Sequence, residues 1–202
     1  MILGNIVMPY HPDHHHRQSI RLRDFDYAGV GGYFVTLCAW QRECLFGDVQ
    51  DGGMRLNGFG MVVGECWAAI PEHFPHVQLD AFVVMPNHVH GILIIDHRHS
   101  VVGAQHAAPL QRAADKMPGP MEKRGITPNN VIPGSLGAVV RSFKSAVTKR
   151  INTMRDNPGC PVWQRNYHEH VIRDERDMYA IRQYIADNPA KWALDDNHPT
   201  RL

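Results

Sequence analysis

The sequence predicts an α+β fold in which helices pack on one face of an antiparallel sheet. Short apolar runs rich in β-branched and aromatic residues alternate with longer segments that carry apolar residues at helical spacing. Two apolar runs follow each other directly and meet at Pro86 and Asn87, so they form an antiparallel pair. This order of elements suits one sheet covered by a layer of helices. The strand-like runs are 33–40, 77–86 and 88–96, and the helical segments are 58–73, 135–155 and 174–188.

Turn residues mark the ends of the shorter strands. The run "YFVTLCAW" begins after "GVGG", which is typical of a strand that follows a turn. The stretch "GDVQDGGMRLN" is predicted to be a hairpin with Asp51, Gly52 and Gly53 in its turn. Residues 162–173, "VWQRNYHEHVIR", follow the break "DNPGCP" and are predicted to be extended.

Each helical segment has an apolar stripe or a terminal signal. The segment 58–73 keeps helical spacing until the region of Pro71 and Pro75, which ends it. The last helix begins after Asp174, a good N-cap, and ends where Pro189 follows Asn188. In 135–155 one side is apolar and another is basic, so one side packs on the sheet. The apolar stripe there comprises Leu136, Val139, Val140, Phe143, Val147, Ile151 and Met154.

Composition indicates one folded domain. The chain has 202 residues, 44% of them hydrophobic, and a formal net charge of +1, so a polyanionic partner must meet a local basic patch. We expect a basic N-terminal arm at 1–28, one domain at 29–192 and a C-terminal tail at 193–202. A flexible insertion at about 97–133, rich in Pro, Gly and Ala, interrupts the domain.

The chain carries no sign of a membrane or secretory destination. No apolar stretch is long enough to span a bilayer, and Pro, Asp and His interrupt the first residues before a signal-like segment develops. The four cysteines lie far apart without a CxxC pair, so we expect reduced packing residues. The sequence therefore predicts a cytoplasmic protein without a membrane partner.

A pair of histidines stands inside the apolar run "VVMPNHVHGILII" at 83–95. Because side chains alternate along a strand, His88 and His90 point to the same side, with Cα atoms about 6 to 7 Å apart. Two imidazoles at this spacing can converge on one metal ion, and other ligands must come from elsewhere in the chain, substrate or water. The alternative is that both rings are satisfied by backbone groups. Burial of two unpaired rings is costly, which favours metal binding.

The last predicted helix offers a nucleophile. Tyr184 and Asn188 are four residues apart and share a helical face. A phenol with a pKa of about 10 is a weak nucleophile at neutral pH, so attack on phosphorus needs a base or a cation nearby. An ion held by His88, His90 and the Asn188 amide oxygen would supply the cation. The alternative is that Tyr184 only packs.

Four stretches in this order resemble the REP-associated tyrosine transposases, which belong to the HUH superfamily of single-strand DNA nucleases. They are "VVMPNHVHGI", "SLGAVVRSFKSAVTKRIN", "VWQRNYHEHVIRDERD" and "IRQYIADNPAKWA". The resemblance implies a ferredoxin-like or RRM-like sheet with the HUH motif on a central strand. It also implies that His88 and His90 bind the metal, that Asn188 is the third ligand and that Tyr184 is the catalytic residue.

The activity implied is that of a transposase and single-strand DNA endonuclease that recognises hairpin DNA formed by a palindromic repeat. Tyr184 would form a covalent 5'-phosphotyrosine intermediate with the help of Mg²⁺ or Mn²⁺. His170 would line the active site. Relatives act as monomers or as homodimers that exchange tyrosine helices, and the sequence leaves this choice, the target repeat and the role of the insertion open. Residues expected to contact DNA are Arg17, Arg21, Arg23, Arg141, Lys144, Lys149, Arg165 and Arg173.

Two other functions fit the same residues. One is a domesticated hairpin-DNA-binding protein with little cleavage activity. The other is a hydrolytic phosphoesterase with zinc at His88, His90 and His170, in which Tyr184 would be dispensable. The intact "HVH" and "YIADNP" favour the transposase, because a pure binding protein needs neither.

Overall fold

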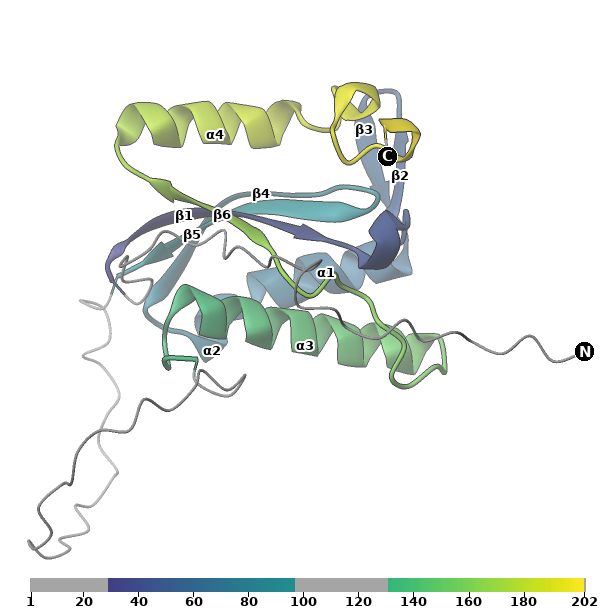
Figure 1. Ribbon diagram of the computed structural model, residues 1–202, viewed down its shortest axis with the longest axis horizontal. Coiled ribbons are helices and arrows are strands. Elements are labelled where there is room, and N and C mark those ends of the chain that lie inside the picture. The colour runs from purple at the N-terminus through teal and green to yellow at the C-terminus, as the bar shows by residue number, and fades with distance from the viewer. Residues whose placement is uncertain (1–28, 97–130, 202) are drawn as a thin grey trace, which may run out of the picture.

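A four-stranded antiparallel sheet forms the centre of the computed structural model, which describes residues 29–96 and 131–201 (Figure 1). The strands lie in the order β4-β5-β1-β6, and chain order gives β1, α1, β4, β5, α3, β6. This is the ferredoxin-like arrangement, so the predicted fold is confirmed. The elements are β1 Gly31–Cys38, β2 Gly47–Gln50, β3 Gly53–Leu56, α1 Gly58–Ala68, α2 Ile70–His73, β4 Val77–Val84, β5 His88–Ile95, α3 Leu136–Met154, β6 His168–Ile172 and α4 Glu175–Asp187.

Most predicted boundaries agree with the structure, and two differ for local reasons. The segment 58–73 divides into α1 and α2 because Pro71 occupies the first turn of a new helix. The extended stretch 162–173 pairs as a strand only from His168, while its earlier part makes an isolated bridge between Trp163 and Ala39. The cap of α4 is as predicted, since the Asp174 carboxylate accepts a hydrogen bond from the Asp177 amide at 2.8 Å.

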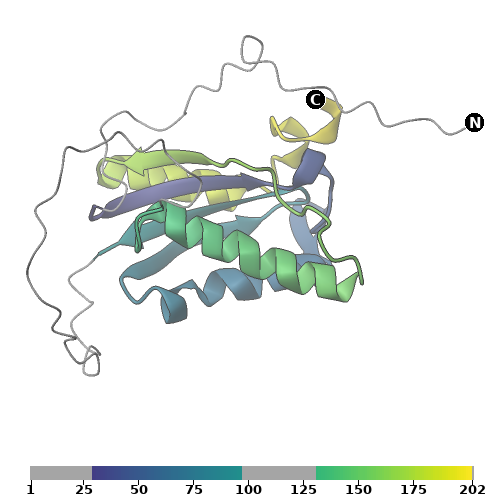
Figure 2. The same ribbon diagram turned by 60° about the horizontal axis from the view of Figure 1, so that its bottom comes forward.

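The hydrophobic core lies between one face of the sheet and the helices α1 and α3 (Figure 2). Alternate residues of β5 and β1 point to this face and are buried. Trp67 of α1 and Phe143 of α3 meet edge to face at 5.4 Å between ring centroids. The core residues of the two strands are Val89, Leu93 and Ile95 of β5 and Tyr33, Val35 and Leu37 of β1.

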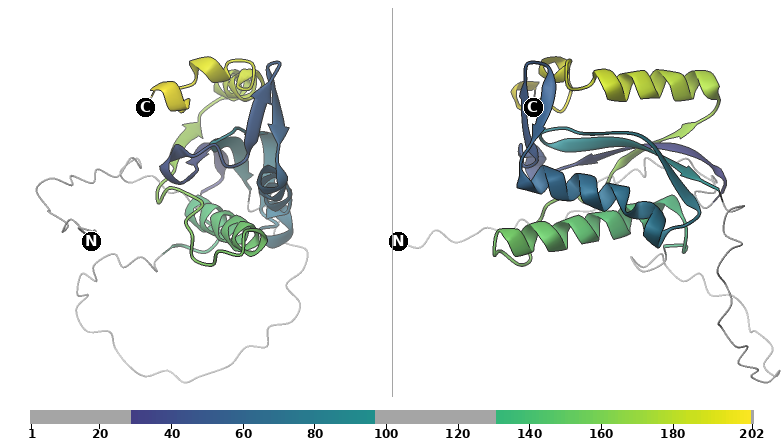
Figure 3. Two further views of the ribbon diagram at one scale, coloured as in Figure 1. Left: turned by 90° about the vertical axis from the view of Figure 1, so that its right-hand side faces the viewer. Right: turned by 180° about the vertical axis from the view of Figure 1, so that it is seen from behind.

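Helix α4 lies on the opposite face of the sheet, which corrects the expectation that all helices share one face (Figure 3). Helix α4 makes little hydrophobic contact with the sheet, because Ile185 is its only buried residue. Polar contacts attach it to both sheet edges, an ion pair from Arg182 to Asp80 of β4 and a hydrogen bond between Asp177 and His170 of β6. The sequence stripe correctly predicted a packed side for α4 but did not reveal which face of the sheet receives it.

Several predicted segments need separate mention. The arm 1–28 lies outside the described residues, as does nearly all of the insertion predicted at about 97–133. The expected C-terminal tail is instead folded against the domain, with short 3-10 helices at Trp192–Leu194 and Pro199–Arg201. Within the described residues, none of the helices combines the length and the apolar character that crossing a bilayer requires.

Replacement of Gly91 by alanine should destabilise the fold. A Cβ at this position would lie 2.3 Å from the Trp67 ring, so the core would have to shift. We expect the free energy of unfolding from urea denaturation to fall by about 1–3 kcal/mol. Gly64→Ala in α1 is the matched control, because its Cβ would meet nothing within 4 Å and alanine favours the helix. Equal stability of the two variants would contradict the packing described.

Candidate functional site

His88 and His90 lie side by side on β5, on the face that α4 covers. Both rings are buried, with exposed fractions of 0% and 2%. Their Nε2 atoms are 3.0 Å apart. Two aromatic nitrogens held this close share either a proton or a cation, so the predicted convergence of the two imidazoles is present in the fold.

Neighbouring polar groups fix the orientation of both rings. The side-chain amide of Asn87 donates from Nδ2 to the carbonyls of Arg42 at 3.0 Å and Asn197 at 2.7 Å. Its Oδ1 therefore faces His88 Nδ1, at 2.9 Å, and accepts a hydrogen bond from the Nδ1–H group. The hydroxyl of Thr36 contacts His90 Nδ1 at 2.9 Å. Fixing Nδ1 in this way leaves Nε2 for a ligand, as in many metal sites.

Burial keeps both histidines neutral. Desolvation lowers the pKa of His88 to about 4, although the carboxylate of Asp195 opposes this. The pKa of His90 is well below its usual value, because of burial and then the nearby charges of His88 and His168. Neutral imidazole is the form that binds metals, so the two rings are ready to act as ligands at neutral pH.

Asp195 and Asn188 bring candidate oxygen ligands to the region of the histidine pair. Asp195 Oδ2 lies 3.9 Å from His88 Nε2, and one ligand atom each of His88, His90 and Asp195 fall within 4.8 Å of one another. Asn188 donates from Nδ2 to Asp195 Oδ2 at 3.3 Å, while its buried Oδ1 has no hydrogen-bond partner in the described residues. A buried amide oxygen without a partner, on a residue that lines the same pocket as His90 and Asp195, fits a divalent cation.

Sequence reasoning missed Asp195. It belongs to the segment expected to be a tail, and nothing in "ALDDNHP" by itself signals a ligand. The tail folds back because the Asn197 carbonyl is bound by Asn87 and the Asn197 amide donates to Asp195 Oδ1 at 2.6 Å. That second contact holds the carboxylate so that Oδ2 faces the histidines.

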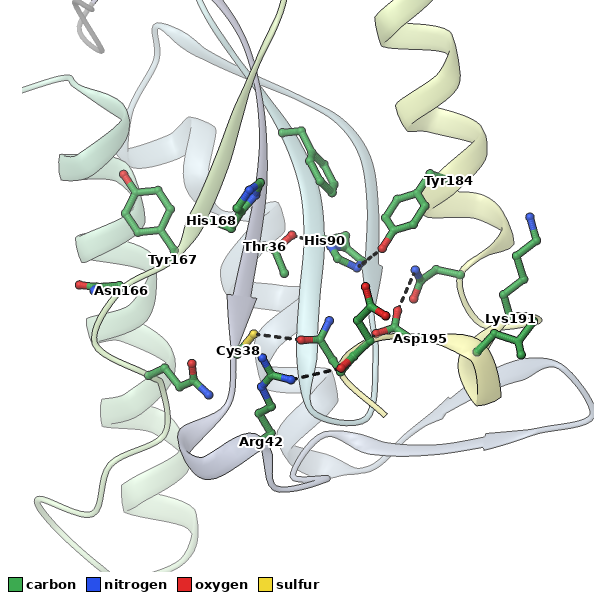
Figure 4. Close-up of a pocket in the computed structure, with 16 residues that line it drawn as sticks. Thr36, Cys38, Arg42, His90, Asn166, Tyr167, His168, Tyr184, Lys191 and Asp195 are labelled. Carbon is green, nitrogen blue, oxygen red and sulfur yellow. Dashed lines mark hydrogen bonds between the residues drawn. The ribbon is translucent and has the colours of Figure 1, made fainter. Parts of the chain in front are cut away.

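Tyr184 points from α4 toward the histidine pair (Figure 4). Its Oη lies 3.3 Å from His90 Nε2, and its ring meets Phe34 edge to face at 6.0 Å between centroids. The side chain is 47% exposed, so a substrate can reach it. Burial of the remainder raises the pKa of the phenol, and the Asp195 charge raises it further. The hydroxyl is thus protonated at neutral pH and needs activation.

These residues line a pocket with a volume of about 650 Å³ between α4, β1, β6 and the C-terminal segment. The pocket includes His168, whereas His170 binds Asp177 at 2.8 Å instead. The strand alternation puts both histidines on one face, but His170 lies opposite Phe34, under the first turn of α4. His170 therefore lies outside the lining of this pocket, and its contact with Asp177 supports neither the expected lining role nor the alternative zinc site.

The residues expected to contact DNA fall into three groups. Lys144 is committed elsewhere, because its ammonium donates to the carbonyls of Gln164 and Asn166, both at 2.9 Å, and burial lowers its pKa to about 8. Its role is to fix the loop before β6. Arg17, Arg21 and Arg23 lie outside the described residues. Arg141, Lys149, Arg165 and Arg173 are exposed.

In metal-free protein, stability should decrease in acid because of the histidine pair. Unfolded His88 takes up a proton near pH 6.5, whereas folded His88 does so only near pH 4. The contribution of the neutral rings to the free energy of unfolding is therefore fully present above pH 6.5. It decreases as the pH drops toward 4, by up to ~1.4 kcal/mol per pH unit for each histidine. Urea denaturation with chelator between pH 7 and 4.5 measures this. The variant His88→Gln/His90→Gln should show a flatter profile, and an unchanged profile would contradict the assignment.

Comparison with known proteins agrees with this architecture. No family model matches the chain. A protein of Haemophilus influenzae, described as uncharacterized, is 40% identical over 186 residues, which span 92% of this chain and 95% of the relative. A solved REP-associated tyrosine transposase bound to a REP hairpin superimposes with a TM-score of 0.50 at 18% identity, over 82% of this chain and 70% of the other. The chain therefore has a transposase-like fold and belongs to the same family as the Haemophilus influenzae protein.

Proposed function

We propose that this protein is a metal-dependent transposase that cleaves and rejoins single-stranded DNA through Tyr184. The observation that carries the proposal is the 3.3 Å approach of the Tyr184 hydroxyl to His90, at the edge of a substrate-sized pocket. A solvent-accessible phenol beside two neutral imidazoles and two oxygen ligands is suited to nucleophilic attack on a phosphodiester. Tyr184 approaches the histidines of its own chain, which supports a site that one copy can supply.

His88, His90, Asn188 and Asp195 would hold the divalent cation. Mg²⁺ and Mn²⁺ fit the oxygen ligands, and imidazole makes Mn²⁺ the better match of the two. A bound cation would polarise the phosphodiester and stabilise the charge that develops on it. Asn87 and Thr36 would keep the two rings aligned while the ligand is bound.

The reaction conserves one phosphodiester bond at each step. The Tyr184 oxygen bonds to phosphorus and loses its proton, while the bond from phosphorus to the 3'-oxygen breaks and that oxygen gains a proton. The product is a 5'-phosphotyrosine and a free 3'-hydroxyl. A 3'-hydroxyl of another strand end can reverse the attack, so strand transfer needs no external energy source.

Hairpin DNA is the proposed substrate. The comparison transposase was solved with a REP hairpin, and this chain shares its fold. A pocket in which Tyr184 reaches a single phosphodiester suits an unpaired strand, and exposed basic residues on α3 and on either side of β6 offer contacts to the paired stem. The exposed residues in question are Arg141, Lys149, Arg165 and Arg173.

Incubation with a labelled hairpin oligonucleotide and Mn²⁺ should give a covalent adduct on a denaturing gel. The adduct should disappear in Tyr184→Phe and in the presence of chelator, because the nucleophile or the cation is then missing. Tyr179→Phe, an exposed tyrosine one turn earlier on α4, is the matched control and should form the adduct normally. Hairpin binding without an adduct under any metal would indicate the DNA-binding protein instead.

Removal of Asp195 should weaken metal binding more than removal of Asn188. The Asp195 carboxylate lies within reach of both histidines and contributes a charge, whereas the Asn188 amide oxygen contributes none. We expect Asp195→Asn to raise the Kd for Mn²⁺ by at least about tenfold, measured calorimetrically without DNA. Asn188→Ala should have a smaller effect and His88→Ala a larger one. Unchanged affinity in Asp195→Asn would exclude the carboxylate as a ligand.

A further inference from the structure

We propose that Arg42 binds a phosphate of the DNA strand in the pocket, at the cleaved bond or at a neighbouring one. The inference rests on the proposed function and adds a residue that neither the histidine motif nor the tyrosine helix includes. Arg42 lies in the short 3-10 turn Trp40–Arg42 after β1 and lines the same pocket as Tyr184 and His90.

The backbone at this turn is strained. Gln41 has φ 53° and Arg42 has φ 56°, so two consecutive residues with side chains adopt the left-handed conformation that favours glycine. The Arg42 carbonyl accepts a hydrogen bond from Asn87 Nδ2 at 3.0 Å, and the same amide orients His88 through Oδ1. Strain of this kind persists where the surrounding structure enforces it, and it clusters at functional sites. The same Asn87 side chain therefore holds both the turn and the His88 ring in place.

The Arg42 guanidinium is positively charged and mostly uncommitted. One nitrogen donates to the Asp196 carbonyl at 3.2 Å. Among the residues that the structure describes, no carboxylate lies within ion-pair distance of it, whereas Arg150 and Arg182 each pair with an acid. The other cation that lines the pocket, Lys191, binds Asp187 at 2.9 Å. Of these two cationic side chains in the pocket lining, Arg42 is thus the one whose N–H donors remain available to a ligand.

A phosphate is the ligand that suits this arrangement. The pocket is already lined by Asp195, Asp196 and the neutral His90, so an entering phosphodiester meets negative charge. A planar guanidinium can offset that charge and bind two phosphate oxygens at once. Figure 4 shows Arg42 and Tyr184 on opposite sides of His90, so a strand that crosses the histidines would meet both side chains.

The test measures binding of hairpin oligonucleotides in which one phosphate at a time is replaced by an uncharged methylphosphonate. All proteins carry Tyr184→Phe, so cleavage does not interfere. With Arg42 intact, neutralising the contacted phosphate should weaken binding about 10- to 100-fold. With Arg42→Gln, binding should already be weak, and that same replacement should have no further effect. The salt dependence of log K should also become shallower by about 0.7.

Two controls separate phosphate binding from a structural role. Arg42→Gly relieves the left-handed strain, so Tm should hold or rise while the phosphate contact is lost, whereas a merely structural arginine would lower Tm. Arg55→Gln, an exposed arginine on β3, should leave the methylphosphonate profile unchanged. The proposal is wrong if the loss of binding affinity caused by Arg42→Gln and the loss caused by each phosphate replacement are simply additive. It is also wrong if only changes of base, and not of phosphate, alter the effect of Arg42→Gln. Adduct formation, measured separately with Tyr184 present, decides the proposed function independently.

Discussion

The alternation of side chains along β5 is the constraint on which the rest of the structure depends. His88 and His90 occupy the face toward α4 only because Val89, Gly91 and Leu93 occupy the face toward α1 and α3. A register shift of one residue would bury the imidazoles in the core and expose the apolar side chains. Pairing with β4 on one side and β1 on the other fixes the register, and the close approach of the Trp67 ring to Gly91 leaves no room for a different residue to face that helix.

A second constraint joins distant segments around that strand. The Asn87 amide binds the turn after β1, the C-terminal segment and the His88 ring at once. Its exposed fraction is 0%, so each of these hydrogen bonds forms away from water and loss of any one would leave a buried polar group unsatisfied. The geometry of the two imidazoles therefore depends on the folding of residues more than a hundred positions away. The same contact between Asn87 and Asn197 also places Asp195 near the histidines.

The sequence predicted the parts of the site that follow from local periodicity. His88 with His90, and Tyr184 with Asn188, are each one strand or helix repeat apart, so their common faces were readable. Asp195, Thr36 and Arg42 were not, because their positions depend on tertiary contacts. Thr36 faces His90 only through the register of β1 with β5. Arg42 has a left-handed backbone, and because it is not a glycine the sequence does not indicate that conformation. The face chosen by α4 was missed for the same reason, since an amphipathic stripe does not identify its partner.

Burial has opposite consequences for the two halves of the site. For His88 and His90 it disfavours the proton, so both rings are held in the form that binds a cation. For Tyr184 it disfavours the phenolate, and the Asp195 carboxylate disfavours it further, so the proposed nucleophile is held in its protonated, less reactive form. His88, His90 and Asp195 would hold a divalent cation, and a positive charge there would offset the Asp195 carboxylate and favour ionisation of the phenol, whose oxygen lies only 3.3 Å from His90. The protein alone thus presents neutral imidazoles suited to a cation but a phenol that stays protonated, which is the physical reason why the proposed strand cleavage would require a metal.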